Sequence, residues 1–254
     1  MFKGRTLMAI FGAEFFYGMV LLGSIYYLPQ FFQLVFGETT TLSGVGLLPV
    51  MLGLMVGNPA AGFITSKKSI SLLNAIVGAT LQVLGLGLMT RWTADTRRAE
   101  AIIVPFLMGT GQGAIISGLL LSAQVAVKPA EIGAVTGLCI FVQCVGNTFG
   151  MALFAAVYVD RLSESFAQLG LAAQKVAHVL ADVQGIRSLF SPDVVERTVD
   201  VYANGMQNGL WLLFAASWMC FICAWLGKRH KFQDYAEAAG DRPAVSGEKR
   251  ESVW

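Results

Sequence analysis

The chain has 254 residues, of which 55% are hydrophobic and only 13% are charged. Soluble domains carry about a quarter charged residues, so this composition argues against a soluble globular protein and predicts a membrane protein. The net charge of +2 is too small to suggest a nucleic-acid partner.

Six segments are long and apolar enough to cross a bilayer as helices, which takes about 20 residues each. They cover about 7–34, 44–64, 70–90, 101–126, 132–158 and 208–227. The first is too long for a signal peptide and is interpreted as a retained span. The sequence therefore predicts an all-α polytopic membrane protein, whose six-helix transmembrane domain occupies residues 1–232.

Basic residues at the ends of the predicted spans indicate the orientation of the chain. If the spans alternate in direction, four basic groups fall on one side, which the positive-inside rule assigns to the cytoplasm; they are Lys3 and Arg5, Lys67 and Lys68, Lys128, and Lys228, Arg229 and Lys231. Arg91, Arg97 and Arg98 conflict with this rule, although Asp95 and Glu100 are expected to neutralise part of their charge. We predict cytoplasmic termini and a plasma-membrane location.

The connection over 159–207 is the long one. Apolar residues recur in it every three or four positions from Phe166 to Val183, which predicts an amphipathic helix on the outer membrane surface or over a cavity mouth. Ser191-Pro192-Asp193 predicts the start of a second, short helix that runs towards Tyr202. Residues 233–254 are polar and charged, which favours a disordered cytoplasmic tail.

Glu14 is the carboxylate that interrupts the first apolar segment. It lies about seven residues from Leu7, or roughly 10 Å into the span, with no Lys or Arg within eight residues. It shares a helix face with Tyr17 and is expected to point into the bundle. Two interpretations remain open: a proton-coupling carboxyl that gains and loses a proton, or a permanently protonated carboxyl that ties two helices together.

Several uncharged amide side chains also lie inside the spans. Each can simply join helices by a hydrogen bond of about 1 kcal/mol, whereas several that face one interior can line a substrate path. The candidates for a substrate path are Tyr17, Gln33, Gln82, Gln112, Gln124, Gln143 and Asn147.

Glycines spaced by four recur within the spans, and they are expected to allow close helix packing because lipid supplies no hydrophobic drive between helices. The same contacts can also let helices slide or rock. Gly57-Asn58-Pro59 predicts a kink in the second span. The candidate packing and hinge residues are Gly53, Gly57, Asn58, Pro59, Gly109, Gly113, Gly146 and Gly150.

Nothing in the sequence indicates an enzyme, a cofactor or a metal site. Cys220 and Cys223 have a metal-binding spacing, but no second ligand pair or nearby histidine completes a site, so core packing is the simpler interpretation. His178 and His230 do not converge with a nucleophile.

Three stretches carry a family resemblance: YYLPQFFQLVFGETTTLSGVGLLPVMLG (26–53), LMGTGQGAIISGLLLSAQVAV (107–127) and VTGLCIFVQCVGNTFGMALFAAVY (135–158). They resemble the fourteen-helix drug:proton antiporter family of the major facilitator superfamily, in particular its fungal toxin and multidrug efflux pumps. The resemblance covers about 2–232. Its motifs occur in order as Tyr27-Leu28-Pro29, Phe32-Gln33, Ser43-Gly44, Leu47-Leu48-Pro49, Ala123-Gln124 and Phe141, Gln143 and Gly146.

The resemblance extends only to the ninth to fourteenth helices of that family. It implies the C-terminal half of a proton-coupled efflux transporter that exports a hydrophobic small molecule, such as a drug, toxin or secondary metabolite. The implied partners are the lipid bilayer, this substrate, protons, and either a missing N-terminal half or a second copy. The alternative is a truncated or regulatory membrane protein that does not transport and packs against a full-length pump.

Overall fold

The computed structural model describes residues 4–68, 71–93, 96–168 and 192–227, and within these ranges it holds helices and no strand. Six long helices are α1 (Arg5–Val35), α3 (Leu48–Lys68), α4 (Ser71–Met89), α5 (Arg98–Val125), α6 (Ile132–Gln168) and α9 (Pro192–Leu226). A six-residue helix, α2 (Thr40–Val45), joins α1 to α3, and a 3₁₀ turn, η1 (Pro129–Glu131), precedes α6. Each long helix contains a stretch apolar enough to cross a membrane, which confirms the predicted six-span, all-α membrane fold.

Two of the helices extend further than the sequence predicts. Helix α6 continues to Gln168, beyond the predicted end of the fifth span at 158. Helix α9 runs without a break from Pro192 to Leu226, so the short helix predicted near Tyr202 and the sixth span form a single helix. Pro192 is the first residue of α9. Proline is tolerated at this position because a backbone N–H there would have no carbonyl partner within the helix. Residues 169–183, which hold most of the predicted amphipathic helix, and the tail 233–254 lie outside the described residues.

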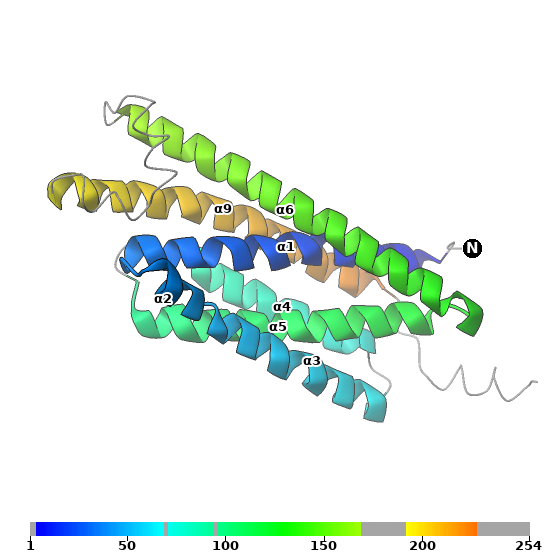
Figure 1. Ribbon diagram of the computed structural model, residues 1–254. Coiled ribbons are helices and arrows are strands. Elements are labelled where there is room, and N and C mark those ends of the chain that lie inside the picture. The colour runs from blue at the N-terminus through cyan, green and yellow to red at the C-terminus, as the bar shows by residue number, and fades with distance from the viewer. Residues whose placement is uncertain (1–3, 69–70, 94–95, 169–191, 228–254) are drawn as a thin grey trace, which may run out of the picture.

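The spans form two groups of three, which Figure 1 shows one above the other. In one group, α5 lies between α3 and α4; in the other, α1 contacts both α6 and α9. The groups meet where α4 packs against α9 and where α1 approaches α5. The N-terminus and the end of α9 lie at the same end of the bundle (Figure 1), as an even number of crossings requires.

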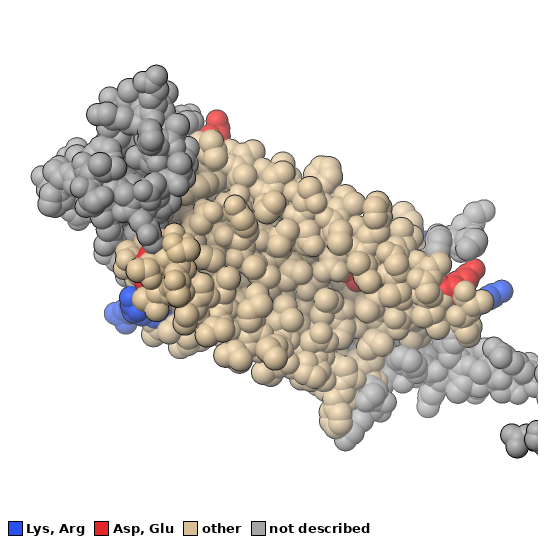
Figure 2. Space-filling view, in the orientation of Figure 1, with Lys and Arg blue, Asp and Glu red and all other residues tan. Residues whose placement is uncertain are grey.

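Buried aromatic and aliphatic side chains fill the interior of the bundle, both within and between the two groups. Near one end, the ring of Tyr27 on α1 stacks on that of Phe154 on α6 with 3.8 Å between centroids, and Phe31 of α1 lies 4.8 Å from Trp92, which follows α4. Figure 2 shows charged side chains gathered at the two ends of the visible face, with an almost uncharged section between them. This distribution fits a bundle whose middle lies in the hydrocarbon of a bilayer.

Helices α3 and α6 leave most of their surface exposed. Only 22% of the residues in the most apolar stretch of each span are buried, compared with 61% in α4. Large apolar side chains on the open surfaces include Leu52 and Met55 of α3 and Phe141 and Phe149 of α6. These two surfaces are therefore available to lipid or to another membrane-embedded protein.

Candidate functional site

Glu14 occupies the interior of the bundle, on the same face of α1 as Ile10 and Tyr17. Glu14 is only 2% exposed to solvent, and its Oε2 atom has no hydrogen-bond partner. An ionised carboxylate is costly inside a membrane unless a cation or several hydrogen-bond donors compensate it. The position therefore favours a neutral carboxyl group that holds a proton.

Tyr17 lies one turn beyond Glu14 and is completely buried, with an unpartnered hydroxyl group. It belongs to a buried cluster that also contains Cys139 of α6 and Cys220 of α9. Cys220 and Cys223 remain free thiols, and no cluster of metal-ligating side chains occurs among the described residues. Glu14 and Tyr17 thus present two polar groups, neither fully hydrogen-bonded, at the place where α1, α6 and α9 meet.

Gln82 of α4 and Gln112 of α5 are completely buried near the middle of their helices. Gln112 donates a hydrogen bond to Ser24 Oγ of α1 at 3.2 Å, and its Oε1 has no partner. Neither amide atom of Gln82 has a partner, and Asn147 Oδ1 of α6 is also unpartnered. Buried polar atoms without partners are exceptions in folded proteins, and they mark places where water or a ligand is expected to bind.

The remaining candidates for the substrate path, Gln33, Gln124 and Gln143, have no unpartnered buried side-chain atom. Gln33 donates to Ser43 Oγ at 2.9 Å and so joins α1 to α2. Gln124 donates to Thr136 Oγ1 at 3.1 Å and joins α5 to α6. Gln143 is half-buried, and its backbone carbonyl lies against Gly18 of α1. The structure therefore places the seven candidates in two groups, and only Tyr17, Gln82, Gln112 and Asn147 have unpartnered buried atoms.

The predicted glycines of α3 and α5 lie at the contact between these two helices. A Cβ atom added to Gly53 or Gly57 would collide with the backbone of Phe106 or Thr110. The contact is reciprocal, because a Cβ on Gly109 or Gly113 would collide with the backbone of α3.

Asn58 and Pro59 border the same contact. The Asn58 carbonyl accepts a hydrogen bond from Ser117 Oγ at 3.4 Å. Pro59 is exposed, and α3 continues through it as helix to Lys68.

Gly146 and Gly150 of α6 lie against the backbone of Phe15 and Met19 of α1. A further glycine contact, between α4 and α5, was not predicted. There Gly78 and Gly111 face each other, and a Cβ on either would come 2.6 Å from the carbonyl oxygen of the other. The sequence signal is a spacing of seven residues, which Gly78 shares with Gly85 and Gly111 with Gly118.

Sequence relatives and solved structures are consistent with one another. The MFS-type transporter ppz2 of Metarhizium majus is 29% identical over 99% of this chain and 45% of its own length. The MFS efflux transporter aclA of Aspergillus oryzae is 32% identical over 63% of this chain and 30% of its own length. The chain is a relative of MFS-type efflux transporters.

The MFS fold is also found by structural comparison. A bacterial homologue of the human lysosomal transporter Spinster, crystallised in an inward-facing and occupied conformation, superposes with a TM-score of 0.63 at 12% identity. That superposition covers 91% of this chain and 50% of the other, so the six spans form one half-bundle of the MFS fold. No protein-family model matches the sequence. The chain spans less than half the length of ppz2 and aclA.

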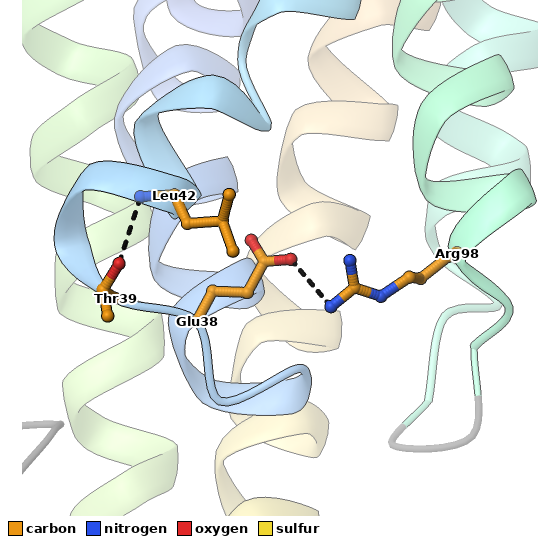
Figure 3. A network of polar contacts seen from close by, with 4 residues as sticks. All are labelled: Glu38, Thr39, Leu42 and Arg98. Atoms are coloured by element: carbon orange, nitrogen blue, oxygen red, sulfur yellow. Dashed lines mark hydrogen bonds and ion pairs between the residues drawn. The ribbon is translucent and has the colours of Figure 1, made fainter.

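One ion pair of this MFS half-bundle was not predicted. The guanidinium group of Arg98, in the first turn of α5, lies 3.0 Å from the Glu38 carboxylate in the turn between α1 and α2 (Figure 3). We expected Asp95 and Glu100 to neutralise part of the charge of Arg91, Arg97 and Arg98; Asp95 lies outside the described residues. The structure pairs Arg98 with Glu38, a carboxylate from another helix connection. A cavity of about 300 Å³ adjoins the pair.

Proposed function

We propose that this chain forms the C-terminal half of a proton-coupled efflux transporter that exports hydrophobic small molecules, such as drugs, toxins or secondary metabolites. The observation that carries the proposal is its similarity to proteins named as MFS-type efflux transporters, of which it spans less than half. The half-bundle fold supports the proposal, because transport by alternating access needs a second bundle on the other side of the substrate site.

The open surfaces of α3 and α6 support a partner bundle. Both helices are exposed on their apolar sides, and α5 and α1, which carry Gln112 and Glu14, lie next to them. A second bundle that packs on α3 and α6 would enclose the space in front of α1 and α5. Its source would be an N-terminal half or a second copy of this chain.

Glu14 is the proposed proton-coupling residue. Its burial and unpartnered Oε2 favour the protonated form when the bundle is closed, and water that enters an opened cavity would favour ionisation. Tyr17, Gln82, Gln112 and Asn147 are the proposed polar lining of the substrate path, because their buried atoms lack partners. Protons and the hydrophobic substrate would then share the interior of one cavity.

The experiment is to co-express the chain with the N-terminal half of the relative ppz2 and to measure efflux of a fluorescent hydrophobic dye from loaded cells. We expect pH-gradient-driven efflux from the pair and none from either half alone. Efflux by the chain alone would favour a homodimer. A stable complex with full-length ppz2, together with no efflux in any combination, would favour the alternative of a regulatory membrane protein.

Glu14→Gln tests the coupling in the same pair. The amide keeps the size of the side chain but cannot titrate, so export should no longer respond to the pH gradient, while the amount of folded protein stays the same. Glu100→Gln is the matched control, because Glu100 is an exposed glutamate in the first turn of α5. Export by Glu14→Gln that equals wild type would leave Glu14 with only a structural role.

The proposed orientation puts both termini in the cytoplasm of a plasma-membrane protein. Thr40 then lies on the outer side, in α2. A cysteine at position 40 should react with an impermeant maleimide added to intact cells, and one at position 240 should react only after permeabilisation. Outer labelling at position 240 would contradict this orientation.

A further inference from the structure

The cavity beside Glu38 and Arg98 lies at the end of the bundle opposite the N-terminus, apart from the Glu14 region. Its walls come from the end of α1, from α2, from the start of α3 and from the start of α5. They are apolar, with the rings of Phe32 and Phe36 on one side and Leu48 and Ile102 among the others. Its volume of about 300 Å³ is at the lower end of the range for small-molecule sites, roughly 300–1,000 Å³.

The turn that carries Glu38 is held in place by its neighbours. Gly37 adopts a positive φ of 63°, which an L side chain rarely accepts, and Thr39 Oγ1 accepts a hydrogen bond from Leu42 N–H at 3.3 Å (Figure 3). The Glu38 side chain is only 8% exposed. Its carboxylate is therefore a fixed, largely buried negative charge at the edge of an apolar cavity.

Arg98 is much more exposed to solvent than Glu38, so it can move away from the ion pair more easily. Its side chain is 65% exposed, and its guanidinium carbon lies 5.2 Å from the centre of the Phe36 ring. If the pair separates, Arg98 returns to water at little cost, whereas Glu38 loses its partner beside the apolar walls of the cavity. A ligand that replaces Arg98 is therefore favoured when it brings its own positive charge.

We propose that this cavity is a binding site for small organic cations, and that Arg98 is a tethered occupant which such a cation displaces. The ligand would carry an ammonium or guanidinium group that pairs with Glu38 above the ring of Phe36, as Arg98 does in the structure. Its body would be compact and apolar to match the cavity walls. The site is independent of transport, so the proposal does not rest on the proposed function.

The test uses the purified chain in lipid nanodiscs and benzyltrimethylammonium carrying a fluorine label, whose binding is followed by ¹⁹F NMR. Neopentylbenzene with the same label is the neutral control, because a carbon atom replaces the charged nitrogen in an otherwise identical shape. We expect the wild-type chain to bind the cation and not its neutral counterpart. Equal binding of both would overturn the proposal, because the cavity would then select only for apolar shape.

Two single variants should change the affinity in opposite directions. Glu38→Gln should abolish binding of the cation. Arg98→Gln should tighten it about tenfold, because the site is free only in the fraction of molecules from which Arg98 has departed. Arg98→Lys, which keeps a tethered cation, should bind like wild type, and so should the control Arg97→Gln at the neighbouring exposed arginine. Unchanged or weaker binding by folded Arg98→Gln would overturn the proposal.

Folding of Arg98→Gln needs its own check, since this variant leaves Glu38 unpaired. The cation should raise its melting temperature more than it raises that of wild type, because binding restores the missing charge. If the variant does not fold, the double variant Glu38→Gln/Arg98→Gln removes both charges and provides the decisive measurement. A preference for the cation that persists in the double variant would show that Glu38 is not its partner and would overturn the proposal.

Discussion

Two helix contacts, α3 with α5 and α1 with α6, are packed in the same way, through glycines that lie against the backbone of the neighbouring helix. Each joins a largely exposed helix to one that carries buried polar residues, Gln112 on α5 and Glu14 on α1. In each, the exposed helix supplies two glycines spaced by four, and each glycine lies against the backbone of its neighbour. Without side chains at these positions the two backbones approach closely, and the dispersion attraction between them stabilises the contact.

The two contacts differ in how much else holds the exposed helix. Helix α5 contributes two glycines of its own, Gly109 and Gly113, to its contact with α3. Helix α3 has few contacts with any helix other than α5. Helix α1 supplies only Gly18 to the α6 contact, while α6 also packs against α9 and is joined to α5 through Gln124. A helix held by one backbone contact should be more sensitive to a single added side chain than a helix held by several neighbours.

The largest effect is expected for Gly57→Leu in α3. A Cβ at position 57 collides with the carbonyl group of Thr110, which is backbone and cannot turn aside. Because α3 has little other support, the helix should separate from α5, and folded protein should be almost absent after purification in detergent. Gly62→Leu on the same helix is the control, since nothing lies within 4 Å of its added Cβ. Equal yields of the two variants would refute the argument.

A smaller effect is expected for Gly150→Leu in α6. Its Cβ collides with the backbone of Met19, but α9 should keep α6 attached in a shifted position. Overpacking of this kind costs about 1–3 kcal/mol, so the protein should fold in reduced yield and melt at a lower temperature than wild type. The control is Gly137→Leu, whose added Cβ meets no atom within 4 Å. A Gly150→Leu variant less stable than Gly57→Leu would reverse the comparison.

The sequence was sufficient to predict the six spans, because a bilayer imposes a length and a composition that can be counted along the chain. It was insufficient to predict the continuity of α9. A helix that starts at Pro192 and runs towards Tyr202 was predicted, but as a short helix separate from the sixth span, because its residues are too polar to lie in a bilayer. No residue between the two stops the helix, so it continues beyond the apolar span.

The burial of Glu14 and Gln112 was also predictable, because the residues before and after each of them on the same face of the helix are mainly apolar or small. The glycine contact between α4 and α5 and the pair of Glu38 with Arg98 were not predicted. Periodicity identifies the face of a helix that is buried, but it does not identify the neighbour that buries it. Both missed features join segments whose proximity follows only from the packing of the whole bundle.

Asn74→Ala should weaken the second attachment of α3. The Asn74 side-chain amide donates to the carbonyl of Ala61 at 2.9 Å and to Thr65 Oγ1 at 2.7 Å, which joins α4 to α3. Losing both bonds should lower the free energy of unfolding in SDS titrations by about 1 kcal/mol, within the range measured for hydrogen bonds between membrane helices. Thr80→Ala is the control, because Thr80 bonds only to Ile76 of its own helix. A stability equal to the control's would show that α3 depends on its glycines alone.

The smallest effect is expected for Gln124→Leu, which removes the hydrogen bond from Gln124 Nε2 to Thr136 Oγ1. Both residues are half-buried, and α6 keeps its contacts with α1 and α9, so the loss should be close to the average interhelical value of about 0.6 kcal/mol. Thr136→Val should cost the same, and the double variant should cost no more than either, because one shared bond can be lost only once. If the two single effects simply add, the bond does not couple α5 to α6, and the stronger attachment of α6 must come from α1 and α9 alone.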